Sequence, residues 1–90
     1  MQVTNVVVRM VEKGGSNFKA FAEVTFDHQI KIHGVRVLSG KKGLFVAMPQ
    51  REAKNKEGKV EYYPYVSLDS DEARREFSQA VLAEYNRQAK

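Results

Sequence analysis

The sequence predicts an α+β fold: a twisted antiparallel sheet of four to five strands in meander order, with one C-terminal helix packed on one face. Alternating apolar and polar residues in the first half of the chain are typical of strands, and apolar residues at three- and four-residue spacing near its end are typical of a helix. With 90 residues, the chain is expected to be a single domain, residues 1–90. A domain this small removes only about 60 to 65% of its unfolded surface from water, so a partner can add to its stability.

The first two strands are predicted to form a β-hairpin. Apolar side chains alternate through residues 6–10 and again through residues 18–26. Between these two segments lie Gly14 and Gly15, which can adopt the positive φ values of a tight turn.

A third strand is expected after a turn at Asp27-His28-Gln29. It begins at Ile30, and its apolar positions change phase across Gly34, from Ile32 to Val35. A phase change at a glycine is typical of a β-bulge.

The fourth strand is the apolar run at residues 44–48, which follows a turn at residues 39–43. Pro49 is expected to end this strand because proline cannot donate a hydrogen bond to the ladder. Residues 50–60 are polar and are expected to form a long loop or a frayed hairpin. Residues 61–66 are a candidate fifth strand, confined to an edge by its proline.

Residues 69–90 are predicted to form the helix. Asp69 followed by Glu72 approximates a capping box at its start, and Arg87 and Lys90 complement the helix dipole at its end. The apolar stripe expected to face the sheet consists of Ala73, Phe77, Ala80, Val81 and Tyr85.

Both faces of the predicted fourth strand are apolar, so both need to be covered. A helix of about 18 residues is roughly 27 Å long and can cover only one of them. The simplest cover for the other face is a second copy of the chain, which predicts a symmetric homodimer. The predicted interface residues are Leu44, Phe45, Val46, Ala47 and Met48.

The charge of the chain is basic, with a net charge of +4 and a pI of about 9.5, as in many proteins that bind nucleic acids or anionic surfaces. The excess lies in residues 40–59, which hold six basic and two acidic side chains. Such cations bind phosphates by displacing condensed counterions, although on the residues alone a solvated loop is the commoner explanation. The cluster consists of Lys41, Lys42, Arg51, Lys54, Lys56 and Lys59.

Two further groups of side chains are candidates for nucleic-acid contact. Tyr62, Tyr63 and Tyr65 follow the basic residues, and aromatic rings beside cations are the composition of a platform for single strands. The commoner arrangement, which we expect, packs Tyr63 and Tyr65 on the helix and leaves Tyr62 at an edge. Arg74 and Arg75 are candidates on the side of the helix, where a solvated face is again the commoner role.

Other chemistries find little support in the sequence. The chain has no cysteine, and its two histidines are too few for a metal site without distant carboxylates. Asp27 beside His28 leaves a small hydrolase as a remote possibility, but turn residues that cap backbone groups are far commoner. We therefore expect no enzymatic activity, no metal or cofactor and no small-molecule substrate.

The start of the chain lacks a leader pattern and no apolar run approaches about 18 residues, so we expect a cytoplasmic protein without a membrane partner.

The run FDHQIKIHGVRVLSGKKGLFVAMPQRE, residues 26–52, resembles the core of the bacterial stage V sporulation protein G family, whose members are also called septation regulators. The similarity extends from VTNVVVRMV near the start to QAVLAEYNR near the end, so it covers nearly the whole chain. Its most specific part is Asp27-His28, His33, Arg36-Val37 and GLFVAMP.

The resemblance implies a small antiparallel-sheet protein with a C-terminal helix that dimerises and binds DNA, and in several cases RNA, as a regulator. The resemblance also implies that Arg51 and Lys54 contact the nucleic acid. After its proline the family typically has a short polar residue and then adjacent basic residues, whereas Gln50-Arg51-Glu52 has one basic residue beside an acid. The segment Tyr62-Tyr63-Pro64-Tyr65 is also unusually aromatic for the family.

Together, the residues and the resemblance predict a regulatory protein, linked to septation, sporulation and cell division, with site-influenced binding of DNA and also of RNA. The basic loop after Pro49 is expected to bind the phosphates. The alternative is a protein–protein interaction module whose basic loop docks an acidic partner without direct nucleic-acid contact.

Overall fold

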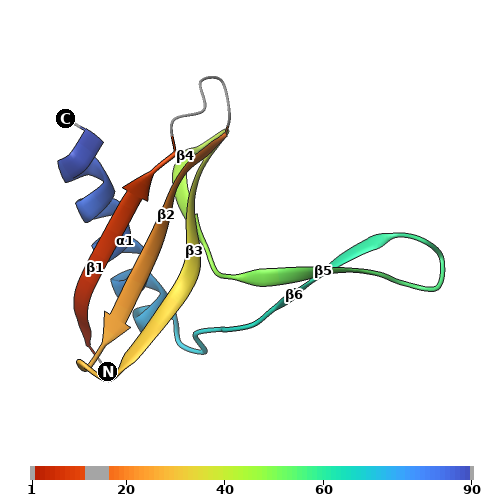
Figure 1. The fold of residues 1–90 in the computed structure, drawn as a ribbon, viewed down its shortest axis with the longest axis horizontal. Coiled ribbons are helices and arrows are strands. Elements are labelled where there is room, and N and C mark those ends of the chain that lie inside the picture. The colour runs from red at the N-terminus through yellow and green to blue at the C-terminus, as the bar shows by residue number, and fades with distance from the viewer. Residues whose placement is uncertain (1, 12–16, 90) are drawn as a thin grey trace.

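Four strands form the main sheet of the computed structural model, which describes residues 2–11 and 17–89. They are β1 (Val3–Met10), β2 (Phe18–Phe26), β3 (Ile30–Gly40) and β4 (Gly43–Ala47), and each pairs antiparallel with the next along the chain. Together with the C-terminal helix α1 (Asp71–Ala89), they confirm the predicted α+β fold (Figure 1). The predicted turn at Gly14 and Gly15 lies outside the described residues.

The predicted bulge in β3 is confirmed. Val24 pairs with Ile32 and Ala22 pairs with Val35, so β3 uses one residue more than β2 between these two pairs. Gly34 lies in this extra stretch with φ of 78°, a left-handed conformation that costs glycine little. The apolar side chains of β3 therefore stay on the same face before and after the bulge.

The hydrophobic core lies between one face of the sheet and α1. Phe77 and Val81 are the buried residues of the helix, and the Phe77 ring stacks on Phe26 with 5.9 Å between the ring centroids. Buried side chains of the sheet alternate with exposed ones, as strand geometry requires. The buried core residues of the sheet are Val8, Ala20, Ala22, Val24, Phe26, Ile32, Val35 and Val37.

The turn between β2 and β3 is held by hydrogen bonds to Gln2 and Thr4, at the start of the chain. Asp27 and His28 both have positive φ, 51° and 56°. The Asp27 Oδ1 atom accepts a hydrogen bond from the Gln2 amide at 2.8 Å, and the His28 amide donates to the Thr4 hydroxyl at 2.9 Å. Asp27 therefore caps backbone groups in a turn, which is the role expected for it.

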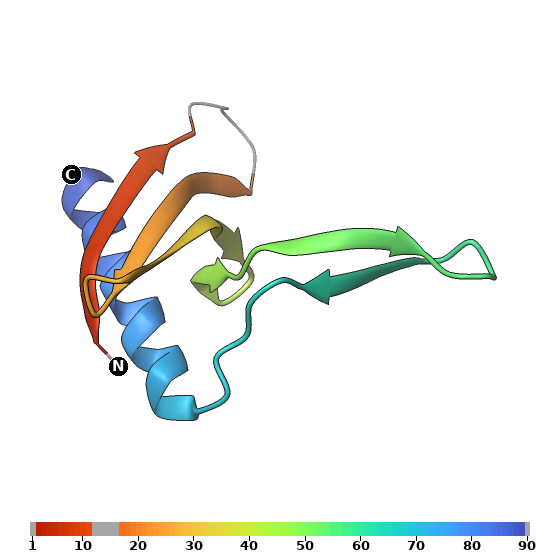
Figure 2. The same ribbon diagram turned by 60° about the horizontal axis from the view of Figure 1, so that its bottom comes forward.

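Residues 50–64 form a β-hairpin that projects from the main sheet (Figures 1 and 2). Of the two alternatives expected for residues 50–60, the hairpin is therefore confirmed and the long loop is wrong. Strand β5 (Gln50–Lys54) pairs antiparallel with β6 (Val60–Pro64) in a sheet of two strands. The predicted fifth strand therefore exists, but it pairs with β5 and does not join the edge of the main sheet. As predicted, β4 ends before Pro49.

The residue that caps the start of the helix lies one position later in the chain than the sequence indicated. Ser70 is the capping residue, because its Oγ atom accepts a hydrogen bond from the Ala73 amide at 3.0 Å. The prediction that Asp69 caps the helix is wrong, since with α1 starting at Asp71 only Ser70 holds the position from which a side chain reaches the amide three residues ahead.

Ser70→Ala is expected to lower the free energy of unfolding by about 1 kcal/mol, because the Ala73 amide loses its acceptor. Urea denaturation measures this change. Asp69→Ala is the matched control and should cost only a few tenths of a kcal/mol through the helix dipole. A larger loss for Asp69→Ala than for Ser70→Ala would contradict the assignment of the cap.

Candidate nucleic-acid interface

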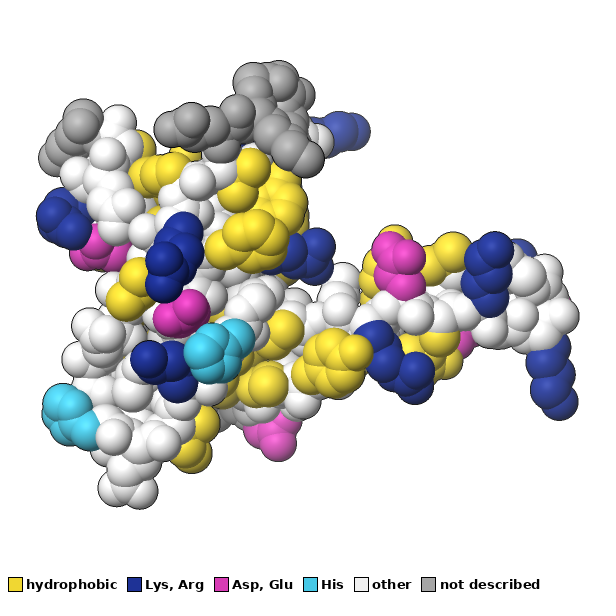
Figure 3. All heavy atoms as spheres, in the orientation of Figure 1, with side chains coloured by type: hydrophobic (Ala, Val, Ile, Leu, Met, Phe, Trp, Pro, Cys, Tyr) yellow, Lys and Arg dark blue, Asp and Glu magenta, His cyan; other side chains and the backbone are white. Residues whose placement is uncertain are grey.

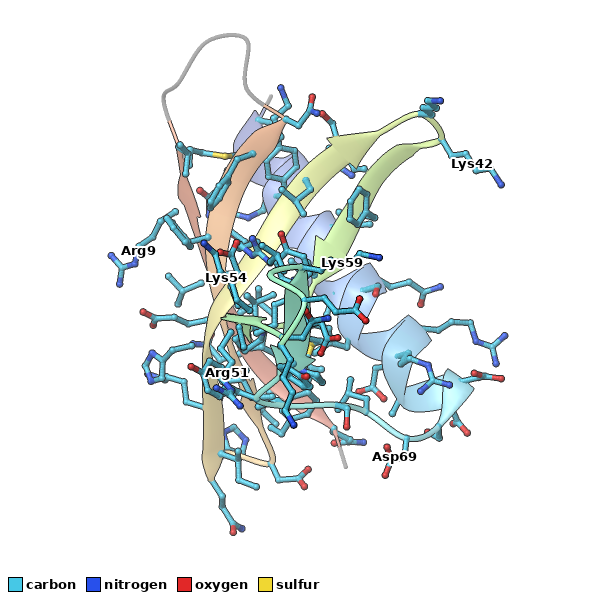
Figure 4. All side chains as sticks on the ribbon, turned by 90° about the vertical axis from the view of Figure 1, so that its right-hand side faces the viewer. Arg9, Lys42, Arg51, Lys54, Lys59 and Asp69 are labelled. Atoms are coloured by element: carbon cyan, nitrogen blue, oxygen red, sulfur yellow. The ribbon has the colours of Figure 1, made fainter. Side chains whose placement is uncertain are left out.

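Four of the predicted phosphate-binding cations lie on the β5–β6 hairpin. Arg51 and Lys54 belong to β5, and Lys56 and Lys59 belong to the turn at the tip. All four residues are exposed. Figure 4 looks along the hairpin and shows Arg51, Lys54 and Lys59 around it, pointing into open space. The structure therefore groups these four cations on one projecting element.

Arg51 is stacked on an aromatic ring. It pairs in register with Tyr63 of β6, and its Cζ atom lies 5.2 Å from the centroid of the Tyr63 ring. This is a cation–π contact, which restricts the guanidinium to one side of the hairpin. Within the described residues Arg51 has no ion pair, so its fork of N–H donors is available to a planar anion such as a phosphate.

The neighbouring carboxylate is occupied by other partners. Glu61 accepts hydrogen bonds from the Tyr63 hydroxyl and from the Asn55 amide nitrogen, the latter at 2.9 Å. The bond from Tyr63, and after it the bond from Asn55, holds the pKa of Glu61 below its ordinary value, while the same bond raises the pKa of Tyr63. Both carboxylate oxygens are thus engaged away from Arg51.

Asn55 connects this network to the tip of the hairpin. Its Oδ1 atom accepts hydrogen bonds from the amides of Glu57 at 2.9 Å and Lys59 at 3.1 Å. Gly58, with φ of 81°, completes the tight turn. Side-chain contacts therefore connect the tip of the hairpin to Arg51. The sequence alone did not reveal the hydrogen bonds that join Asn55, Glu61 and Tyr63. The signal was the segment Asn55-Lys56-Glu57-Gly58, whose first and last residues are typical of such turns.

Lys41 and Lys42 lie elsewhere, on the turn between β3 and β4. In Figures 1 and 4 this turn is at one end of the main sheet, whereas the hairpin leaves from beside the other end of β4. The six cations that are close in the sequence are therefore divided between two separate elements.

Arg74 and Arg75 lie in the first turns of α1. The Arg74 guanidinium pairs with Asp71 and also donates to the Leu68 carbonyl, so its donors are partly used within the chain. Arg75 is exposed and has no ion pair within the described residues. Neither residue belongs to the hairpin, and acidic residues precede both.

The expectation that Tyr63 and Tyr65 pack on the helix is wrong. Tyr62, Tyr63 and Tyr65 are exposed by 56%, 42% and 68%, and the first two belong to β6, which pairs with β5. They miss the helix because the chain leaves the main sheet at residue 49 and returns only after the hairpin. The three tyrosine rings therefore lie in the same projecting segment as the cations of the hairpin.

The face of the main sheet away from α1 carries both apolar and charged side chains. Phe21 and Phe45 are exposed by 47% and 48%, and Figure 3 shows hydrophobic side chains gathered on this face. Near them, Glu23 lies 3.6 Å from Arg9 and 3.8 Å from His33. We call this surface the open face.

The five predicted interface residues are divided between the two faces. Leu44, Val46 and Met48 are half-buried against the hydrophobic core. Phe45 and Ala47 alternate with them and point to the open face. The second side of β4 therefore has no cover from α1.

Neither a metal centre nor a membrane span emerges from the residues that the structure describes. Residues 2–11 and 17–89 contain no group of three or more metal-ligating side chains close enough to hold an ion. Within the same ranges, no helix combines the length and the apolar character needed to cross a bilayer.

Comparison with known proteins gives the family. The model of the SpoVG family matches residues 1–87. The chain belongs to the SpoVG family. The "Putative septation protein SpoVG 2" of Listeria monocytogenes serotype 4b is 40% identical over 87 residues, which cover 97% of this chain and 80% of that relative. Proteins named "Putative septation protein SpoVG" from Brevibacillus brevis and Clostridium acetobutylicum are 38% and 36% identical, and each match covers 97% of this chain and 86% of the relative. The resemblance found in the sequence is thereby confirmed.

Tyr63→Phe is expected to raise the pKa of Glu61 toward its ordinary value, because it removes the largest cause of the lowered pKa. NMR titration of the glutamate carboxyl carbons measures this change. Because the folded-state pKa is lowered, the bond supports the hairpin above the ordinary pKa of glutamate, and its support is lost as the pH falls through the lowered value. Tyr62→Phe is the control and should leave the titration of Glu61 unchanged; equal effects of the two variants would contradict the network.

Proposed function

We propose that this member of the SpoVG family is a regulator that binds DNA, and also RNA, with the β5–β6 hairpin as its main contact to phosphates. The observation that supports this most is Arg51, which is stacked on Tyr63 and has no ion pair within the described residues. A guanidinium held in this way loses less conformational entropy when it binds a phosphate.

The exposed lysines extend this site along the hairpin. Lys54 ends β5, and Lys56 and Lys59 belong to the turn at the tip of the projecting hairpin (Figure 1). Each phosphate that they neutralise releases condensed counterions, so binding should weaken as salt is added. These contacts carry little sequence information, so preference for particular sites depends on a smaller number of contacts to bases.

The names of the relatives suggest the process in which such a regulator acts. They are called septation proteins, and their family is named for sporulation. A nucleic-acid-binding regulator of these processes would work in the cytoplasm, where the chromosome and the transcripts are. It would act by binding, and the proposal includes no catalytic step. Asp27 and His28, the two residues considered for catalysis, belong to the turn between β2 and β3.

The proposal includes a homodimer formed through the open face. Phe21 and Phe45 expose large apolar surfaces there, and α1 covers only the other face of the sheet. A two-fold symmetric pairing would cover the same patch on both subunits. It would also bring two hairpins into one particle, which raises the effective concentration of the second hairpin once the first has bound.

Arg51→Ala combined with Lys54→Ala should weaken binding of all sequences, since phosphate contacts are lost. On duplex DNA each lost contact should reduce the slope of log affinity against log salt by about 0.9. With roughly two to four contacts per subunit, the dimer should start from a slope of about −3 to −7. Titrations at several salt concentrations measure both quantities.

Lys41→Ala combined with Lys42→Ala is the charge-matched comparison, because it removes the same two charges from the other turn. It should have the smaller effect. An equal loss for both pairs would mean that the hairpin is not the main contact. If the unchanged protein binds neither DNA nor RNA at about 50 mM salt, the proposal fails and docking of an acidic protein partner becomes the better explanation.

Phe45→Glu should produce monomers or aggregates, because a charge would be buried without a partner in the interface. Ala47→Glu tests the neighbouring position on the same face. Light scattering coupled to size-exclusion chromatography measures the mass in solution. Phe45→Leu keeps an apolar side chain and should preserve the dimer. A soluble dimer with Phe45→Glu would show that the open face is not the interface.

A further inference from the structure

Two tyrosines of the hairpin region have exposed rings without any partner in the described part of the chain. Tyr62 and Tyr65 are exposed by 56% and 68%, and neither side chain takes part in a hydrogen bond or a ring contact there. Tyr63 differs from them, since its ring carries Arg51 and its hydroxyl binds Glu61. We propose that Tyr62 and Tyr65 stack on unpaired bases, so that the hairpin prefers single-stranded nucleic acid to duplex. This inference rests on the proposed function.

The arrangement of charges around Tyr62 suits a single strand. Tyr62 pairs in register with Glu52, and Lys54 pairs with Val60, so Lys54 lies diagonally across from the Tyr62 ring on the same face of the hairpin. Such a diagonal neighbour is about 7 to 8 Å away at its Cα atom, within reach of a long side chain. The Lys54 ammonium can therefore reach the phosphate of a base stacked on the Tyr62 ring, although the Glu52 carboxylate lies directly opposite Tyr62.

Tyr65 follows β6 at the base of the hairpin, three positions beyond Tyr62, so strand alternation puts the two rings on different sides of the hairpin. Its amide donates to the Pro49 carbonyl at 3.0 Å, so its backbone is fixed where the two strands begin. Its side chain is the most exposed of the large apolar residues. Each of the two rings is thus a separate stacking position beside the cations of the hairpin, and exposed rings beside cations are the composition used for single strands.

The charge of the hairpin argues against duplex as the preferred ligand. Residues 50–64 hold four basic and three acidic side chains, so their net charge is only +1. Duplex DNA carries a charge for every 1.7 Å or so of its axis and is bound mainly through its phosphates. A hairpin can enter the major groove, but the bases there present their edges while their faces are stacked on each other. Tyrosine rings can stack on bases only where the faces of the bases are free, as they are in a single strand.

The test compares the protein with Tyr62→Val combined with Tyr65→Val on three probes: a short DNA strand of mixed sequence, the RNA of the same sequence, and the DNA duplex. Valine removes the ring but keeps the high strand propensity of the position. The variant should lose about 5- to 150-fold in affinity per stacked base on the single strands, and less than about twofold on the duplex. Tyr62→Phe combined with Tyr65→Phe keeps both rings and should bind like the unchanged protein.

Tyrosine fluorescence supplies a second readout, because the chain has four tyrosines and no tryptophan. Single strands should quench this fluorescence in the unchanged protein and much less in the valine variant. Equal losses on single strands and duplex would show that the two rings only support the hairpin, and no loss would show that they are not used; either result overturns the inference while leaving the proposed function in place. Failure of the unchanged protein to bind any of the three probes would instead overturn the proposed function.

Discussion

Pro49 has no amide hydrogen, and the shape of the molecule depends on this missing donor. The ladder between β3 and β4 ends at the pair Arg36 and Ala47, and Pro49 lies beside Gly34, where a Cβ atom added to the glycine would be in ordinary van der Waals contact with the proline ring at 3.5 Å. Pro49 cannot donate a further hydrogen bond to this ladder. The chain therefore leaves the main sheet. When it returns, the Tyr65 amide donates to the Pro49 carbonyl, which closes the base of a separate hairpin. The same residue that ends the hydrophobic strand thus starts the projecting element.

A two-stranded hairpin without a hydrophobic core is only marginally stable by itself, so its order has to come from local contacts. The Asn55 side-chain oxygen accepts hydrogen bonds from two backbone amides at the tip, its side-chain nitrogen donates to Glu61, and Tyr63 joins Glu61 to the stacked Arg51. These contacts lie on the surface, where each contributes modestly. Their value for binding is that they arrange the donors before the ligand arrives, which reduces the entropy lost on association.

The sequence predicts the parts of the fold that bury apolar side chains and fails where nothing is buried. Alternation in β1 and β2, the phase change at Gly34 and the stripe around Phe77 all arise from one shared core. Strand β6 has no buried residue, so apolar periodicity could not reveal its pairing with β5, and the turn residues were the remaining signal. For the site, the sequence identified the cations but could not show that Lys41 and Lys42 lie apart from Arg51, because proximity along the chain does not fix proximity in space.

In the proposed function the hairpin combines two kinds of attraction to nucleic acid, and their balance follows from its residues. Glu52, Glu57 and Glu61 offset most of its positive charge, so phosphates alone would hold it weakly at the salt concentrations of a cell. The engagement of Glu61 by Tyr63 and Asn55 keeps one of these carboxylates from neutralising Arg51 directly. The rings supply attraction that salt does not screen. If the proposed function holds, a single basic residue after Pro49 would be sufficient for binding only where a stacked ring, and a second hairpin on a partner subunit, add to what Arg51 contributes.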